Sequence, residues 1–215
     1  MNVYNNNNNK TIKKMNLLTQ NAKMKKTSKE NKTKIFNFSI PAYKTKQGKV
    51  TCPFAKECVK YCYAQKGNYK RFPIIQDLME KKYEISKQNN FNSLMNEEIQ
   101  KKKAKYIRIH DSGDFYSIKY LRKWILIAEY NKEVIFYAYT KSIKFFKDYN
   151  ITLPDNFKVI FSEGSKTDNL INTLKDRHAR IFKDVTTLLN AGYIDASNND
   201  LKAITTNKKV GLVYH

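Results

Sequence analysis

The spacing of hydrophobic and polar positions along the chain changes at about residue 34. From Ile35 onwards, short continuous apolar runs alternate with stretches in which apolar residues recur every three or four positions. Short runs bounded by turn residues predict buried strands, and the wider spacing predicts amphipathic helices. The expected strands are residues 35–40, 106–109, 134–139, 159–161, 179–182 and 210–214.

The helical spacing is clearest between the second and third expected strands, where Ile118, Leu121, Trp124 and Ile125 share one face. Weaker patterns predict further helices over residues 75–83, 94–99, 143–149 and 185–189. Because strands and helices alternate, we expect an α/β protein with a mostly parallel sheet of β-α units. About six such strands would form a partial or open (β/α) barrel.

Residues 1–33 have a different composition. They contain the Asn5–Asn9 tract and eight Lys against one Glu, with few large apolar residues. Such a segment buries too little surface to offset the entropy of ordering. We therefore expect a disordered basic tail over residues 1–33, followed by a single α/β domain over residues 34–215.

The chain has no run of about 18 apolar residues, and its first residues are rich in Asn and Lys rather than apolar. Neither a membrane span nor a secretory signal is expected, and we place the protein in a cytoplasm.

The formal net charge of +22 suggests a polyanionic partner such as nucleic acid. Only five of the 41 basic residues are Arg, however, and Arg is the residue suited to bidentate readout of phosphate or guanine. Lys, Asn, Ile, Tyr and Phe share A- and T-rich codons, so codon bias alone could produce this charge. Non-specific nucleic-acid binding through the Lys-rich surface and tail stays open, whereas base-specific recognition is not expected.

The three cysteines lie within eleven positions, as Cys52-x5-Cys58-x3-Cys62. An odd, clustered set is a poor disulfide framework and a good metal-ligand set in a reducing compartment. Three thiolates on one loop suit a [4Fe–4S] cluster, whose fourth iron then stays free for an exogenous ligand. Zinc is the alternative and would need a fourth ligand, for example His110 or His215. Buried structural thiols are disfavoured by the charged residues between the cysteines.

Polar residues follow the expected strands where each strand ends. In parallel α/β folds this carboxyl edge of the sheet is where ligands bind. The candidate site residues are therefore His110, Asp111, Ser112, Asp114, Thr140, Lys141, Ser142 and Glu163.

These residues also have plainer interpretations. Asp114 or Ser117 could be the N-cap of the helix that begins near Ile118, and Ser142 the N-cap of the next helix. His110 could be a hydrogen-bonded structural residue, and Glu163 an exposed loop residue. Lys141 argues for a ligand, since a Lys at the start of a helix is unfavourable unless an anion is nearby. The catalytic residue stays open, with His110, Asp111 and Glu163 as candidates.

The stretch Tyr61-Cys62-Tyr63-Ala64 resembles the end of the radical S-adenosylmethionine (SAM) signature. In that family three cysteines hold a [4Fe–4S] cluster and SAM chelates the open iron. The usual spacings are three and two residues, whereas this chain has five and three. The resemblance implies that Tyr61 packs beside the adenine, and that polar strand-end residues bind the rest of SAM. The implied cofactor-binding set is Tyr61, Asp111, Ser112, Asp114, Thr140, Lys141, Ser142 and Glu163.

A longer resemblance covers about residues 35–215. The segments 108–115 and 136–142, together with Trp124 and the terminal Leu212-Val213-Tyr214-His215, resemble the phage gene product 88 family. That family has no established activity. The resemblance therefore implies a phage, prophage or viral setting, with a host cytoplasm as the location, and a shared site rather than a reaction.

Two functions follow from these patterns. The leading hypothesis is a radical SAM-type enzyme, in which a reduced cluster cleaves SAM to a 5′-deoxyadenosyl radical that acts on a small-molecule, nucleotide or nucleic-acid substrate. This enzyme would need an electron donor as a partner, and no membrane partner is expected. The alternative is a non-catalytic nucleic-acid-binding phage protein with a structural zinc or cluster. A site for another metal-activated ligand is a third possibility.

Overall fold

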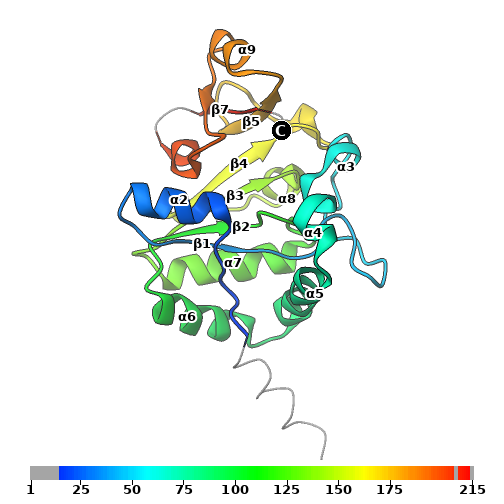
Figure 1. Ribbon diagram of the computed structural model, residues 1–215, viewed down its shortest axis with the longest axis vertical. Coiled ribbons are helices and arrows are strands. Elements are labelled where there is room, and N and C mark those ends of the chain that lie inside the picture. The colour runs from blue at the N-terminus through cyan, green and yellow to red at the C-terminus, as the bar shows by residue number, and fades with distance from the viewer. Residues whose placement is uncertain (1–14, 206–207, 214–215) are drawn as a thin grey trace, which may run out of the picture.

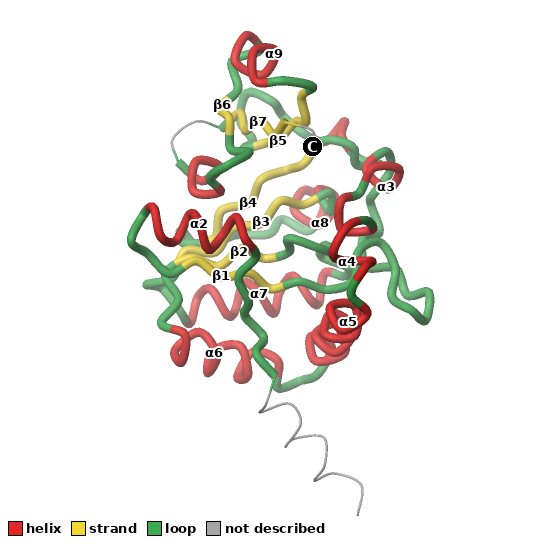
Figure 2. Tube along the Cα trace, in the orientation of Figure 1, coloured by secondary structure: helices red, strands yellow, loops and turns green. Residues whose placement is uncertain are grey.

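The computed structural model describes residues 15–205 and 208–213. Its centre is a seven-stranded sheet in which all the described strand pairs are parallel. The strand order is β1 (Ile35–Phe38), β2 (Tyr106–Ile109), β3 (Ile135–Thr140), β4 (Phe157–Ser162), β5 (His178–Phe182), β7 (Lys209–Val213) and β6 (Ile194–Asp195). The sheet curls into a half-barrel (Figures 1 and 2). The expected α/β class and partial barrel are confirmed.

Among the described strands, β6 alone was not predicted from the sequence pattern. It has only two residues, which is too short for any periodicity to register. It pairs with β7 at the edge of the sheet, so the spatial order of the strands departs from their chain order there.

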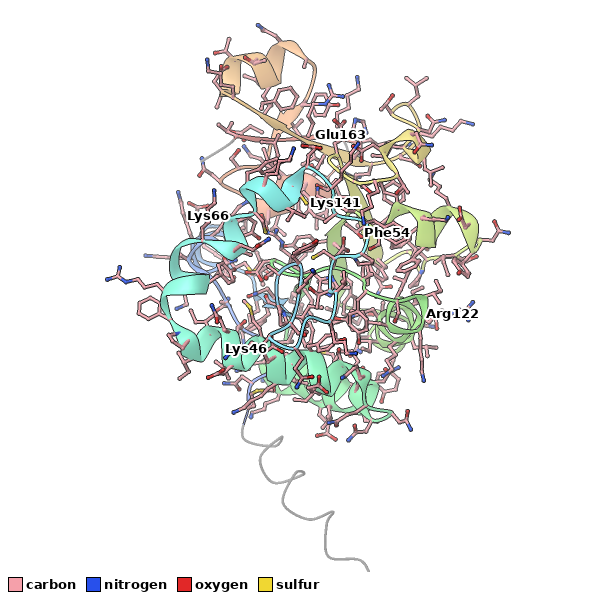
Figure 3. The ribbon with its side chains drawn as sticks, turned by 90° about the vertical axis from the view of Figure 1, so that its right-hand side faces the viewer. Lys46, Phe54, Lys66, Arg122, Lys141 and Glu163 are labelled. Carbon is pink, nitrogen blue, oxygen red and sulfur yellow. The ribbon has the colours of Figure 1, made fainter. Side chains whose placement is uncertain are left out.

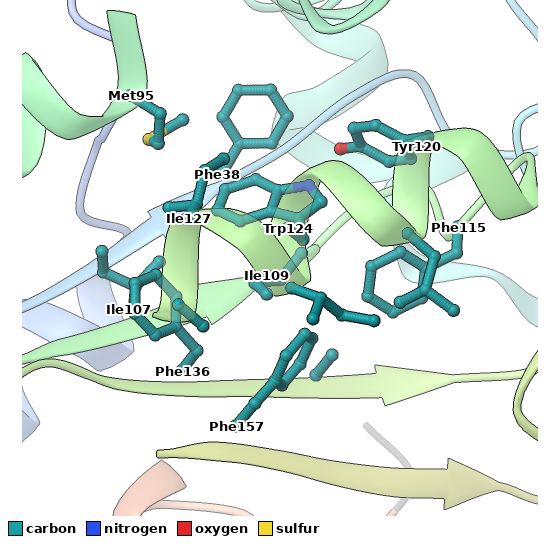
Figure 4. Close-up of a cluster of buried hydrophobic side chains, with 14 of the residues drawn as sticks. Phe38, Met95, Ile107, Ile109, Phe115, Tyr120, Trp124, Ile127, Phe136 and Phe157 are labelled. Carbon is teal, nitrogen blue, oxygen red and sulfur yellow. The ribbon is translucent and has the colours of Figure 1, made fainter. Parts of the chain in front are cut away.

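One face of the sheet is covered by α6 (Phe91–Lys102) and α7 (Ile118–Tyr130), which lie below it in Figure 1. The side chain of Ser117 accepts the backbone N–H of Tyr120 and so caps α7. Trp124 is fully buried at the centre of this layer, edge-on to Phe38 at 5.3 Å and to Phe91 at 5.5 Å between ring centroids (Figure 4). The apolar stripe expected on α7 is thus buried in the core, with Leu121 and Ile125 beside Trp124.

The opposite face of the sheet is partly covered by α2 (Ala22–Glu30) and the 3₁₀ helix η3 (Asp200–Ile204). The prediction of a disordered tail is wrong for residues 15–33, because Leu17, Leu18 and Met24 are buried against the domain. The segment has few apolar residues, but these few are buried against a core that the rest of the chain forms, and this burial offsets the entropy of ordering. Residues 1–14 lie outside the described part of the chain.

Three further helices belong to the described part of the chain. They are α5 (Pro73–Lys87), which begins with a favourable Pro at its first position, α8 (Ile143–Asp148) and α9 (Val185–Asn190). Within residues 15–205 and 208–213, no helix is long and apolar enough to cross a membrane.

Candidate functional site

The three cysteines lie on the segment that leaves the carboxyl end of β1. Cys52 is in a loop, Cys58 is the first residue of the short helix α3 (Cys58–Tyr61), and Cys62 follows its last residue. All three are free thiols and partly buried. The sheet is parallel, so this loop meets the loops that follow β2, β3 and β4 at one edge.

The cysteine loop is fixed against the loop after β4. The backbone N–H of Lys56 donates to the carbonyl of Gly164 at 3.2 Å, and that of Lys166 donates to the carbonyl of Phe54 at 2.8 Å. The ring of Phe54 packs edge-on against Phe145 of α8, with centroids 5.1 Å apart. These contacts hold the thiols over the edge of the sheet.

The pKa values of Cys52 and Cys58 are raised by burial, by the charge of a neighbouring thiolate and by one buried carboxylate. Burial raises the pKa of Cys52, and the charges of Asp114 and Cys62 raise it further. Burial also raises the pKa of Cys58, with Lys141 opposing and Cys62 and Asp114 adding to the effect. Ionised together, these groups would repel, and a bound cationic centre relieves such repulsion while deprotonating the thiols.

In the part of the chain that the structure describes, no three His, Cys, Asp or Glu side chains are placed to hold one ion. Tetrahedral zinc with bonds of about 2.3 Å needs sulfurs roughly 4 Å apart. A [4Fe–4S] cube binds each cysteine through a different iron and therefore needs a wider triangle.

Asp114 joins the loops after β2 and β3. It accepts the hydroxyl of Thr140 at 2.6 Å and the backbone N–H groups of Lys141 and Phe115 at 2.8 and 2.7 Å. Burial raises its pKa, and these hydrogen bonds oppose the rise. Ser142 donates to the carbonyl of Phe115 at 2.8 Å. Asp114, Thr140 and Ser142 therefore hold the two loops in register.

Lys141 points from β3 towards the end of β4. Its ammonium group donates to Ser162 Oγ at 2.9 Å and to the carbonyl of Glu163 at 2.7 Å. The carboxylate of Glu163 pairs with Arg180 at 2.7 Å. Figure 3 shows Lys141 and Glu163 close together on the face that carries the cysteine loop.

Gly164 stands at the centre of a small set of donors. Its φ is +95°, and a Cβ placed on it would lie 3.3 Å from Tyr61 Oη, 3.7 Å from Lys141 Nζ and 3.8 Å from the backbone nitrogen of Cys58. An ammonium, a phenol and a backbone amide thus lie around Gly164, and a side chain at this position would crowd them. Of the expected cofactor-binding residues, the structure brings Tyr61 and Lys141 together here.

Asp111 is held by a second network. Its carboxylate accepts hydrogen bonds from the hydroxyl of Ser39, from Asn21 Nδ2 at 2.9 Å and from the hydroxyl of Tyr69 at 3.0 Å. Its backbone carbonyl accepts the hydroxyl of Tyr63. The neighbouring Ser112 is buried, and its hydroxyl has no partner among the described residues.

His110 is placed in the aromatic core. Its Nε2 lies 2.9 Å from the hydroxyl of Tyr120, and its ring centroid is 4.9 Å from that of Phe115. Burial, with a smaller contribution from Arg108, lowers the pKa of His110 to about 3. These surroundings favour the structural role over the catalytic and zinc-binding ones. His215, the other expected zinc ligand, lies outside the described residues.

Sequence reasoning missed a buried ion cluster on the opposite face of the sheet from α7. Arg108 Nη1 and Lys23 Nζ bind the two carboxylate oxygens of Asp200 at 2.8 and 2.5 Å, and the hydroxyl of Tyr137 donates to the same carboxylate at 3.2 Å. Arg108 sits between Ile107 and Ile109, which face the core. That alternation was the available signal that Arg108 faces the other side of the sheet.

Lys82 of α5 was also missed. It is buried, and burial lowers its pKa to about 8 although Asp111 and Glu98 oppose the change. A cavity of about 310 Å³ lies between residues 41–46 and α5, with Gln65 and Tyr69 in its wall. The amide nitrogen of Gln65 is buried without a partner among the described residues, and none of the cysteines lines the cavity.

Fold and site together define an α/β protein with a curled parallel sheet and three thiols at its carboxyl edge. The family model of gene product 88 matches residues 14–215, and the chain belongs to that phage family. This confirms the longer of the two resemblances. No curated protein and no solved structure is significantly similar to the chain.

Proposed function

We propose that this phage-family protein is a radical SAM-like iron–sulfur enzyme that reductively cleaves SAM to act on a second substrate. The observation that carries the proposal is the meeting of three free thiols with Asp114, Lys141 and Gly164 at the carboxyl edge of a curled parallel sheet. When bound, a [4Fe–4S] cluster held by three cysteines supplies an electron to a ligand on its fourth iron.

A cluster is proposed rather than zinc because of the donor set. Cys52, Cys58 and Cys62 would hold three irons, and the repulsion among thiolates and Asp114 is what such a centre would offset. For zinc, the proposed fourth ligand His110 has its Nε2 next to Tyr120 and its ring in the core. Three ligands without a fourth are not a closed structural zinc site.

The donors around Gly164 would bind the SAM carboxylate. Lys141 Nζ, Tyr61 Oη and the Cys58 amide lie within 4 Å of the position that a Cβ on Gly164 would take. Since Cys58 is itself a proposed cluster ligand, a carboxylate bound there would be next to the metal centre. Tyr61 would additionally present its ring to the adenine.

The amino and ribose groups of SAM would be bound by the loop after β2. The carboxylate of Asp111 accepts three hydrogen bonds and that of Asp114 also three, which leaves each with one further acceptor position. The unpartnered hydroxyl of Ser112 is a third free group. Thr140 and Ser142 would position Asp114, and Glu163 would lie at the rim, held by Arg180.

SAM binding to the anaerobically reconstituted full chain tests these assignments. We expect Cys62→Ala and Asp111→Ala to abolish binding while the circular dichroism spectrum is retained. Asp148→Ala is the matched control, because Asp148 is an exposed residue at the end of α8 and forms only a long contact to Lys144 at 3.7 Å. Binding by Asp111→Ala equal to that of Asp148→Ala would contradict the assignment.

The second candidate function is a non-catalytic nucleic-acid-binding protein with a structural zinc or cluster. The chain's excess of Lys favours it. It predicts salt-sensitive nucleic-acid affinity that is indifferent to Asp111→Ala and an absence of SAM binding. For either function the proposed compartment is a host cytoplasm, where thiols stay reduced. An electron donor is a required partner only of the enzyme.

A further inference from the structure

Positive charge is concentrated on the cysteine segment. Residues 42–71 contain eight Lys and Arg against one acidic residue, Glu57, whereas residues 72–215 contain 24 basic and 17 acidic residues. Thirty residues thus carry a net charge of +7, the same as the 144 residues that follow. Codon bias acts along the whole chain and does not explain why acidic residues are scarce in this segment.

Much of this charge is not neutralised locally. Lys60 pairs with Glu57 at 2.8 Å and Lys46 with Asp77 at 2.5 Å. Lys56, Lys66 and Arg71 are exposed, and no carboxylate of the described residues forms a salt bridge with them.

Figure 3 shows Lys46, Lys66 and Lys141 on the face that the cysteine loop covers. The carboxylates of Glu57 and Glu163 on this face are paired with Lys60 and Arg180, so a polyanion that approaches it would meet an excess of cations.

Exposed aromatic residues lie among these cations. Tyr63, the residue after Cys62, is 56% exposed, and Phe72 is 45% exposed. Tyr63 is held by its hydroxyl on the carbonyl of Asp111 and by an edge contact with Tyr69 at 5.9 Å. The Arg71 guanidinium lies 5.7 Å from the Phe72 ring centroid.

We infer that the cysteine-loop surface, formed by Lys56, Tyr63, Lys66, Arg71 and Phe72, binds single-stranded nucleic acid. Fixed aromatic faces beside unpaired cations suit unstacked bases and the phosphates that link them. A duplex hides its base faces inside the stack, so the exposed rings of Tyr63 and Phe72 favour a single strand. A base stacked on Tyr63 would lie beside Cys62, so the inference names the substrate class of the site and in that respect rests on the proposed function.

Fluorescence anisotropy of the full chain with labelled single strands of about 12 nucleotides, both deoxy and ribo, tests the inference. We expect Phe72→Ala and Tyr63→Leu each to weaken binding at least fivefold, roughly the effect of losing one stacked base. Tyr63→Phe keeps the ring and should bind like the native chain. Lys66→Gln and Arg71→Gln should each make the slope of log K against log salt concentration shallower by about 0.7.

The matched controls lie at the opposite edge of the sheet. Tyr130 at the end of α7 is 72% exposed, and Lys101 and Lys102 end α6. Tyr130→Ala and Lys101→Gln/Lys102→Gln should leave binding unchanged. Equal losses in these controls, or tighter binding of a matched duplex, would overturn the inference.

Two further results distinguish this inference from binding of an acidic protein and from the proposed SAM reaction. Displacement of the strand by polyglutamate as effectively as by unlabelled oligonucleotide would assign the surface to an acidic protein instead and overturn the inference. The assay needs no SAM. SAM cleavage by a protein that binds no strand would therefore overturn this inference alone, and strand binding without SAM cleavage would overturn the proposed reaction alone.

Discussion

The carboxylate of Asp114 accepts the backbone N–H of Lys141 at 2.8 Å. One buried side chain at the end of β2 thereby fixes the loop after β3, and Lys141 in turn reaches the end of β4. Hydrogen bonds thus link the loops after β2, β3 and β4 at the carboxyl edge of the sheet. The cysteine loop is bound to the loop after β4 by its own backbone hydrogen bonds.

Asp114→Ala should therefore destabilise the fold as well as the site. Removing the carboxylate leaves the Thr140 hydroxyl and the Lys141 and Phe115 amides without their acceptor, which should cost about 3 kcal/mol of unfolding free energy in urea titrations. The exposed Asp184, which caps α9 through Thr187, is the control, and Asp184→Ala should have a clearly smaller effect. Equal losses would show that Asp114 is not the link between the loops.

Gly164→Ala should impair SAM binding more than stability. A Cβ at this position would crowd Tyr61 Oη at 3.3 Å and would also contact Lys141 and the Cys58 amide, so we expect at least a tenfold loss of SAM affinity by isothermal titration. Gly192→Ala is the control, because Gly192 also has a positive φ, +76°, but a Cβ placed on it would have nothing within 4 Å. If both variants bind SAM alike, the three donors around Gly164 are not a ligand site.

Asp200→Asn should destabilise the protein strongly. It leaves Arg108, whose side chain is 14% exposed, without its carboxylate partner, and Lys23 loses the same partner. Uncompensated buried charge typically costs about 3–5 kcal/mol. Asp77→Asn removes the exposed pair with Lys46 and should leave the unfolding midpoint nearly unchanged, as expected for a surface ion pair. A midpoint shift for Asp200→Asn no larger than for Asp77→Asn would contradict the cluster's role.

His110 should make the native chain less stable in acid. Its pKa is about 3 in the folded protein and about 6.5 in the unfolded chain, so between these values the unfolded chain binds more protons. Stability should fall as the pH drops below about 6.5, by about 2 kcal/mol at pH 5 from this residue. Urea unfolding of the native chain and of His110→Gln at pH 7.5 and 5 checks this. Identical pH dependence in the two proteins would show that His110 is not buried as a neutral ring.

Periodicity predicted the main strands and helices because each carries its own apolar pattern. The run Tyr106–Ile109 and the stripe around Trp124 are strand and helix as expected. The pattern also located the strand ends, and with them the loops that hold Asp114, Lys141 and Glu163. Parallel pairing follows from alternating strands and helices, so the edge of the site could be predicted too.

Contacts between distant segments could not be predicted in the same way. The partner of Arg108 is Asp200, 92 positions away, and that of Asp111 includes Asn21, 90 positions away. Residues 15–33 fold because they meet surfaces built elsewhere in the chain, which composition does not reveal. The same holds for His110, whose aromatic surroundings come mainly from α7 and the loop before it.

The central claim is that Cys52, Cys58 and Cys62 hold an iron–sulfur cluster with one open iron. The most direct test is to purify the full chain without oxygen, reconstitute it with iron and sulfide, and measure the iron content and the reduced EPR spectrum with and without SAM. The proposal predicts about four irons per chain, lost in Cys58→Ser, and a [4Fe–4S] signal that changes when SAM is added. Stoichiometric zinc with no cluster signal would contradict it.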